Sequence, residues 1–286
     1  MRGRMTAACV AGALVLAACG GDDGGGTDDN ASSDTAAPAE ETTTTTMAPE
    51  SFRILVANDD GYAAEGIDAL VEGLLTLEDV EVTVYAPLAN QSGTSDNTNP
   101  GLTEATTEET TRSGYPAVAV DGFPADSVEQ GLEAMAAELP HLVVSGINEG
   151  QNIGPLTELS GTVGAARTGA RAGIPALAVS QGLFINGGPE PDYPAAVEIA
   201  LGWIDEHRAD LVAAEPVDGI AEVTNINVPT CPTGEQGELI EVPVATEAEV
   251  GGDDLGAVDC ETEVTDLPHD VAGFLAGHPV QSQLTA

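Results

Sequence analysis

The sequence predicts an α/β protein, a three-layer α/β/α sandwich around a Rossmann-like, mainly parallel sheet. Three observations predict this fold. Apolar runs of strand length alternate with stretches in which apolar residues recur at helical spacing. The stretches between successive strands are long enough for a helix, which implies right-handed crossovers and parallel pairing. The strands are short apolar runs, as expected in a sheet that helices cover on both faces.

The predicted elements begin after residue 50. Phe52–Ala57 is an apolar run of strand length, and apolar residues between 67 and 75 then repeat at helical spacing. Val80–Pro87 is the next strand, which its proline ends. The same alternation continues, with strands expected over 117–120, 141–145, 175–180 and 223–228 and helices over 127–139, 162–172 and 193–214.

The charge of the chain argues against several classes of function. Its 286 residues include 48 acids against seven arginines and no lysine, for a formal net charge of −41. Without lysine the chain has no Walker-type phosphate loop and no Schiff-base or pyridoxal-phosphate chemistry. A surface this anionic repels nucleic-acid phosphates, so we expect no nucleic-acid duplex among its partners.

Residues 1–19 are predicted to be a lipoprotein signal peptide. Two arginines precede the apolar run 11–18, which is too short to span a bilayer. The tetrad that ends at Cys19 resembles a bacterial lipobox, in which the cysteine is lipidated and becomes the mature N-terminus. We therefore expect an extracytoplasmic protein anchored to the cell membrane as a lipoprotein. The alternative is an ordinary secretory signal that contains a cysteine.

Residues 20–50 are predicted to be a disordered acidic and Thr-rich linker, because almost none of them can be buried. The folded domain is expected over residues 51–286. Eight acids lie in the linker, so 40 acids and five arginines remain for the domain, a net charge of −35. Two interpretations of this acidity stay open: adaptation to salt, which screens the self-repulsion, and compositional drift in a genome that avoids lysine.

Two cysteines, Cys231 and Cys260, remain after the signal peptide and Cys19 are set aside. Outside the cytoplasm they have one pairing, so we expect a disulfide, with two free thiols as the alternative. Neither has a close Cys or His companion at ligand spacing, which argues against a zinc site.

Polar clusters follow three of the predicted strands: Asn58-Asp59-Asp60-Gly61, Asn90-Gln91-Ser92-Gly93 and Ser145-Gly146-Ile147-Asn148. In a parallel sheet, ligands bind beyond the carboxyl ends of the strands, where such loops meet. If these strand ends are neighbours, they form an all-oxygen site suited to Mg²⁺ or Mn²⁺ from Asp59, Asp60, Ser92 and Asn148. Each cluster is also a good turn sequence, so each alone has a purely structural interpretation.

A fourth cluster, Ser160-Gly161-Thr162, opens the helix expected over 162–172. Ser160 can cap this helix, and the free amides of its first turn suit an anion because the helix dipole is positive there. A plain N-cap without a ligand is the alternative. Arg167 and Arg171 follow in the same helix, and we expect them to pair with surface acids.

These residues resemble the SurE-type 5'/3'-nucleotidases, the survival protein SurE family. The resemblance covers residues 52–230 and, weakly, the rest of the chain. Single motifs are unspecific, but their order along the chain is specific. They lie at residues 53–61 with Gly66-Ile67, 86–87 with 90–93, 122–127, 145–152, 160–163, 175–180 and 225–229.

The resemblance implies a metal-dependent phosphomonoesterase that hydrolyses nucleoside 5'/3'-monophosphates to nucleoside and phosphate. Asp59 and Asp60 are then the catalytic residues, with Asp60 positioning the attacking water. Position by position, the implied ligands of a divalent cation (Mg²⁺ or Mn²⁺) are Asp59, Asp60, Ser92 and Asn148, and the implied phosphate-binding residues are Asn152, Ser160, Gly161 and Thr162.

The chain also departs from the family pattern. Thr168 stands where the family commonly has an acid, and residues 96–114 are polar and Thr-rich, unlike the usual continuation. The family's extended arm is barely traceable after Pro229. Arm and C-terminus commonly make oligomer contacts in this family, so a homodimer stays open. The alternative function is a non-catalytic extracytoplasmic lipoprotein that binds a phosphorylated or nucleotide ligand.

Overall fold

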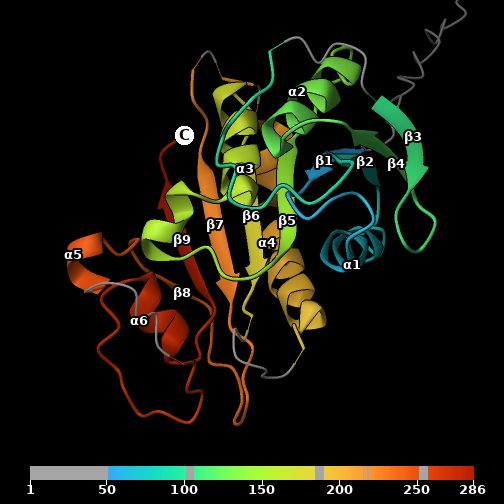
Figure 1. Ribbon diagram of the computed structural model, residues 1–286. Coiled ribbons are helices and arrows are strands. Elements are labelled where there is room, and N and C mark those ends of the chain that lie inside the picture. Colours follow the sequence, from blue (N-terminus) through green and yellow to red (C-terminus); the bar gives the residue numbers. More distant parts are fainter. Residues whose placement is uncertain (1–50, 101–105, 184–189, 215, 218, 251–256) are drawn as a thin grey trace, which may run out of the picture. The chain divides into compact units, whose positions relative to one another are not determined.

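A nine-stranded sheet forms the middle layer of the fold (Figure 1). The computed structural model describes residues 51–100, 106–183, 190–214, 216–217, 219–250 and 257–286. The predicted signal peptide with Cys19 and the predicted linker lie outside these described residues. In chain order the elements are β1 (Phe52–Ala57), α1 (Glu65–Leu74), β2 (Val80–Pro87), β3 (Thr106–Thr110), β4 (Pro116–Val120), α2 (Pro124–Ala134), β5 (Leu142–Glu149), the 3-10 helix η1 (Gly154–Glu158), α3 (Gly161–Arg171), β6 (Ala176–Gln181), α4 (Tyr193–Ala213), β7 (Val223–Val228), β8 (Ile240–Glu241), α5 (Glu247–Val250), α6 (Asp270–Leu275) and β9 (Val280–Leu284).

The sheet is mainly parallel, as predicted. Its strand order is β3-β4-β2-β1-β5-β6-β7-β9-β8. Every neighbouring pair from β4 to β7 is parallel, whereas β3 and β9 run antiparallel to β4 and β7. The carboxyl ends of β1, β2, β5, β6 and β7 therefore share one edge, which is where ligands bind in sheets of this kind.

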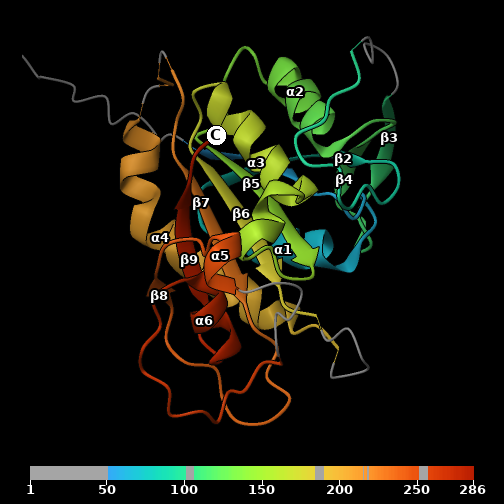
Figure 2. The ribbon, with the colours of Figure 1, turned by 60° about the vertical axis from the view of Figure 1, so that its left-hand side comes forward.

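Helices pack on both faces of the sheet, so the three layers predicted from the sequence are confirmed. Figure 2 shows α4 on one side of the sheet and α2 and α3 on the other. Side chains of β1 alternate between the two cores: Phe52, Ile54 and Val56 pack with α1 and α4, while Leu55 and Ala57 pack with α2 and α3. Each large apolar side chain buried in this way contributes about 1.5–3 kcal/mol of burial free energy.

Several boundaries differ from the prediction, and strand β3 was not predicted. Helix α2 starts at Pro124 instead of Ser127, because proline suits the first helical position and the Asp126 carboxylate accepts a hydrogen bond from the Phe123 amide at 2.8 Å. Strand β3 lies in the Thr-rich region that carries no strand pattern. It is an exposed edge strand that, among the described residues, pairs with β4 alone, so its residues need no apolar alternation.

The C-terminal segment builds a third, smaller core. Val280 of β9 packs there with Val271 and Phe274 of α6 and with Ile153 from the loop after β5. The buried carboxylate of Asp270 accepts backbone hydrogen bonds at 2.8 Å from Gly154, Ala245 and Val271, and so ties α6 to that loop. The C-terminal segment thus supports the loop that follows the carboxyl end of β5.

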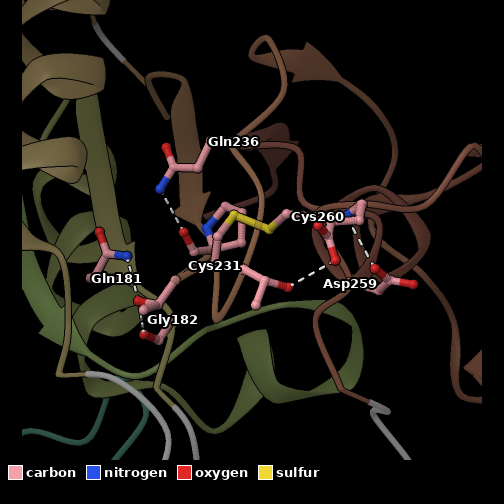
Figure 3. Close-up of a disulfide and its surroundings, with 10 residues drawn as sticks. Gln181, Gly182, Cys231, Gln236, Asp259 and Cys260 are labelled. Atoms are coloured by element: carbon pink, nitrogen blue, oxygen red, sulfur yellow. Dashed lines mark hydrogen bonds between the residues drawn. A yellow bond between two sulfur atoms is a disulfide. The ribbon is translucent and has the colours of Figure 1, made fainter.

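A disulfide joins Cys231 to Cys260 across a separation of 29 residues (Figure 3). In the chain-entropy model a loop of this length stabilises the folded state by about 3–4 kcal/mol. The residue before Cys231 is anchored to the end of β6: Gln181 donates to the Thr230 hydroxyl at 2.8 Å, and Thr230 donates to the Gly182 carbonyl at 2.6 Å. The disulfide therefore holds the C-terminal segment to the sheet near its carboxyl edge.

Candidate functional site

The loops after β1, β2 and β5 meet at the carboxyl edge of the sheet. Strand β1 lies between β2 and β5, so its end is flanked by both neighbours. The Asn58 side chain closes the turn after β1 by bonding the backbone of Gly61 in both directions, at 3.0 and 3.1 Å. This turn presents Asp59 and Asp60 at its tip, and the Gln91 amide donates to the Asp59 carbonyl at 2.7 Å.

Asp60 links the other two loops through its carboxylate. Oδ1 accepts from the Asn90 side chain at 3.0 Å, and Oδ2 accepts from the backbone amide of Glu149 at 2.9 Å. Asn148 therefore lies one residue from a direct contact with Asp60. The pairing of β5 with β6 shifts register between Ser145 and Asn148, an irregularity that redirects the strand at this point.

Asp59 is buried against the start of α3. The residue is only 3% exposed, and its carboxylate accepts a hydrogen bond from the Thr162 hydroxyl at 2.7 Å. A Cβ placed on Gly161 would lie 2.8 Å from Asp59 Cβ and 2.9 Å from its Oδ2. Only glycine allows the first turn of α3 to approach Asp59 this closely.

The surroundings of Asp59 and Asp60 disfavour the ionised form of both carboxyl groups. Burial raises the pKa of Asp59, although the Thr162 hydroxyl and backbone amides including those of Thr162 and Gly161 lower it in part. Burial also raises the pKa of Asp60 to about 6, and the nearby carboxylates of Asp59 and Glu149 add to that rise. A cation between these groups would relieve both effects.

The first turn of α3 presents its backbone amides and a capping side chain next to Asp59. Ser160 caps the helix by accepting from the Val163 amide at 3.1 Å, as predicted. Arg167 pairs with Glu158 at 2.6 Å, and Arg171 pairs with Asp96 at 2.5 Å, so the prediction that both arginines pair with acids is also confirmed. An anion bound at this turn therefore depends on backbone amides and hydroxyl groups.

Asn152 lies at the centre of a buried polar network. Its side-chain nitrogen donates to the Ser180 hydroxyl at 2.9 Å and to the Thr162 hydroxyl at 3.4 Å. Thr162 in turn donates to Asp59, so one chain of hydrogen bonds joins the predicted phosphate positions to the predicted metal positions.

The structure brings together most of the predicted site residues. Asp59, Thr162 and Asn152 are joined by hydrogen bonds, and Ser160 and Gly161 lie in the same turn as Thr162. Ser92 is exposed on the loop after β2, where its backbone amide donates to the Asn90 side chain at 3.0 Å. Asn148 is buried, and its side-chain nitrogen donates to the Gly150 carbonyl at 2.6 Å.

Sequence reasoning missed Asn90, Glu149 and Ser180 as members of this site. Asn90 lies in the turn sequence Asn90-Gln91-Ser92-Gly93, but that sequence does not indicate that its side chain reaches Asp60. Ser180 is the last residue of the strand predicted over 175–180, and only the register of β6 with β7 places it next to Asn227. Their roles depend on contacts between strands, which a linear pattern does not show.

The donor set fits a hard divalent cation. It combines the buried Asp59 and the half-buried Asp60 carboxylates with hydroxyl and amide oxygens, which are ligands that Mg²⁺ and Mn²⁺ accept. Within the described ranges no group of three or more His, Cys, Asp or Glu side chains is placed to hold a metal, so a site rich in nitrogen, sulfur or carboxylate ligands is not formed there. Two carboxylates leave coordination positions for water and substrate.

Fold and site together define a Rossmann-like α/β protein in which two neighbouring acids and the N-terminus of a helix meet at the carboxyl edge of the sheet. The family model of survival protein SurE matches residues 54–247, and the chain belongs to this family. The chain is also similar to the crystal structure of the SurE protein from Aquifex aeolicus, with 27% sequence identity and a TM-score of 0.61. That match covers 82% of this chain and 93% of the other. Membership indicates a phosphatase of the nucleotidase type in a family that generally depends on divalent metals.

Proposed function

We propose that the protein is a metal-dependent phosphomonoesterase that hydrolyses nucleoside 5'/3'-monophosphates to nucleoside and phosphate. One observation carries the proposal: the Thr162 hydroxyl, in the first turn of α3, donates to the buried Asp59 carboxylate at 2.7 Å. A site for a cation and a site for an anion are therefore separated by a single hydrogen bond. A phosphate ester that binds a divalent cation needs this combination of neighbours.

Each group of residues has a defined task in this proposal. Asp59, Asp60, Ser92 and Asn148 hold a divalent cation, which when bound polarises the ester and lowers the pKa of a water molecule. Asp60 orients the attacking water, because its carboxylate is fixed by Asn90 and Glu149 at the open side of the site. The phosphate is held by Asn152, Ser160, Gly161 and Thr162.

Backbone amides replace cationic side chains in holding the phosphate. Three arginines of the domain bond elsewhere: Arg112 pairs with Glu65 at 2.7 Å, Arg208 donates to the carbonyl of Glu78 at 2.6 Å, and Arg53 donates to the carbonyl of Leu139 at 2.9 Å. The other two bond the acids described above. Oriented amides at a helix N-terminus stabilise the charge that develops on the phosphoryl oxygens without a mobile side chain.

A phosphate-release assay on the full chain tests the function. AMP and p-nitrophenyl phosphate are expected to be hydrolysed in Mg²⁺ or Mn²⁺, with activity lost in excess EDTA and restored by either metal. Tight, metal-dependent binding of AMP without release of phosphate would instead establish the non-catalytic binding protein. Absence of both binding and release contradicts either function.

We also propose that the protein acts outside the cytoplasm, anchored by lipid on Cys19. The proposal rests on the sequence of residues 1–19, which lie outside the described part of the chain. Among the described residues no helix has the length and apolarity to cross a bilayer. Cys19→Ser is therefore expected to move the protein from the membrane fraction to the soluble fraction of the expressing cells, and an unchanged distribution would contradict lipid anchoring.

A further inference from the structure

We propose that Asn225 and Asn227 on β7 are positioning residues that fix Asn152 for contact with the substrate phosphate, an inference that rests on the proposed function. Residues 225–229 carry part of the family resemblance, but the site described above gives these two asparagines no task. The structure indicates a task for them, because both side chains form hydrogen bonds with the backbone of Asn152.

The contacts hold the peptide groups on both sides of one residue. Oδ1 of Asn227 accepts from the Asn152 amide at 2.6 Å, while Nδ2 of Asn227 donates to the Asn152 carbonyl at 3.2 Å. Nδ2 of Asn225 donates to the same carbonyl at 2.9 Å. A primary amide side chain carries a donor and an acceptor together, so Asn227 alone can satisfy both groups.

The alternation of β7 explains why two asparagines reach one target. Residues 225 and 227 lie on the same face of the strand, whereas Ile226 between them packs in the opposite core. The partner of Asn225 on β6 is Ala178, whose small side chain leaves room, and the partner of Asn227 is Ser180. Ser180 completes the support by accepting from the Asn152 side chain at 2.9 Å.

Stability alone explains Asn225 poorly. The side chain is 1% exposed, and its Oδ1 has no hydrogen-bond partner among the described residues. A buried amide oxygen without a partner costs free energy, and an apolar side chain of similar size would avoid that cost. The bond that Asn225 does make serves Asn152.

The support continues from Asn152 towards the predicted metal position. Its side chain donates to Thr162, which donates to Asp59, so the orientation of Asn152 affects groups on both the phosphate and the cation side. All four members of this chain from β7 to β1 are at most 8% exposed, which limits their motion: Asn227, Asn152, Thr162 and Asp59.

A double-mutant cycle tests the inference in the full-length protein. Asn227→Ala is expected to raise the KM for AMP and the Kd for inorganic phosphate by about tenfold, with a smaller change in kcat. In the Asn152→Ala background the same substitution should add less than about twofold, because Asn227 bonds the backbone of residue 152 and acts on the phosphate only through the Asn152 side chain, which that variant lacks. The inference is overturned if the loss in the double variant equals the product of the losses in the two single variants. It is also overturned if Asn227→Ala folds and has the wild-type KM and Kd.

Thr224→Val is the matched control. Thr224 is a buried polar residue on the same strand, but its hydroxyl bonds Gln283 of β9. This variant should lower the melting temperature and leave KM and phosphate affinity unchanged. If Asn227→Ala does not fold, Asn225→Ala replaces it in the cycle, because the Asn152 amide then keeps its bond to Asn227.

Phosphate calorimetry separates this inference from the proposed function. If the wild-type protein binds phosphate but hydrolyses no ester, the proposed function fails. The double-mutant cycle, measured through the Kd for phosphate, then still decides the role of Asn227. If the wild-type protein hydrolyses AMP and the losses multiply, the positioning role fails alone. If phosphate neither binds nor is released, both fail together.

Discussion

Replacing Asp59 with asparagine is expected to lower kcat/KM for AMP by about a thousandfold or more. Asparagine keeps the shape of the side chain and an oxygen for the Thr162 hydroxyl, but it removes the buried one of the two carboxylate charges available to hold a cation. Initial rates of phosphate release at saturating Mn²⁺ measure the effect. Activity within twofold of the wild-type value would exclude Asp59 as a metal ligand.

Asp59→Asn is expected to lower activity but not to lower the stability of the folded protein. Burial raises the pKa of Asp59 in the folded protein, so its ionised form is disfavoured there relative to the unfolded chain. In EDTA at pH 7, Asp59→Asn should therefore melt at the same temperature as the wild-type protein or higher. Asp205→Asn is the control, because it removes one charge from the exposed face of α4 and should change neither activity nor its metal dependence.

Gly161→Ala is expected to lower kcat/KM by about a hundredfold or more. The new methyl group would lie 2.8 Å from Asp59 Cβ and 3.1 Å from Pro124 Cγ, so either Asp59 or the first turn of α3 must move. Displacement of a catalytic group by about 1 Å costs roughly this factor. The overpacked site should also reduce the free energy of unfolding by about 1–3 kcal/mol in a denaturant titration.

Gly202→Ala provides the control for this substitution. Gly202 lies in the middle of α4, and a Cβ added there meets no atom within 4 Å. Alanine should stabilise the helix by about 0.5–1 kcal/mol and leave catalysis unchanged. Equal losses of activity in Gly161→Ala and Gly202→Ala would show that the effect at Gly161 is not caused by its approach to Asp59.

The central layers of this fold were predictable because buried parallel strands carry a strong local signal. The bounds of β1, β2 and β7 match the expected ones. Strand β3 and the C-terminal elements carry no such signal: β3 is polar and exposed, and β9 is defined by its antiparallel pairing with β7. Such elements depend on partners distant in sequence, which a local pattern cannot report.

The residue types of the site were predictable from the sequence, whereas the hydrogen bonds between them were less so. The polar residues at strand ends identified the edge of the sheet, and the cap at Ser160 followed from local chemistry. The hydrogen bonds that orient Asp60 and Asn152 come from side chains on other strands. Their identities depend on strand order and register, which place Asn227 beside Ser180.

The placement of the arginines affects how a substrate reaches this protein. All five in the domain are engaged with acids, carbonyls or a histidine, so no guanidinium group draws a dianionic ester towards the site. A substrate must diffuse inward against the field of a domain with a net charge of −35. Dissolved ions shorten the range of that field, so the rate of productive encounter should rise with ionic strength, opposite to the behaviour of enzymes that attract their substrates.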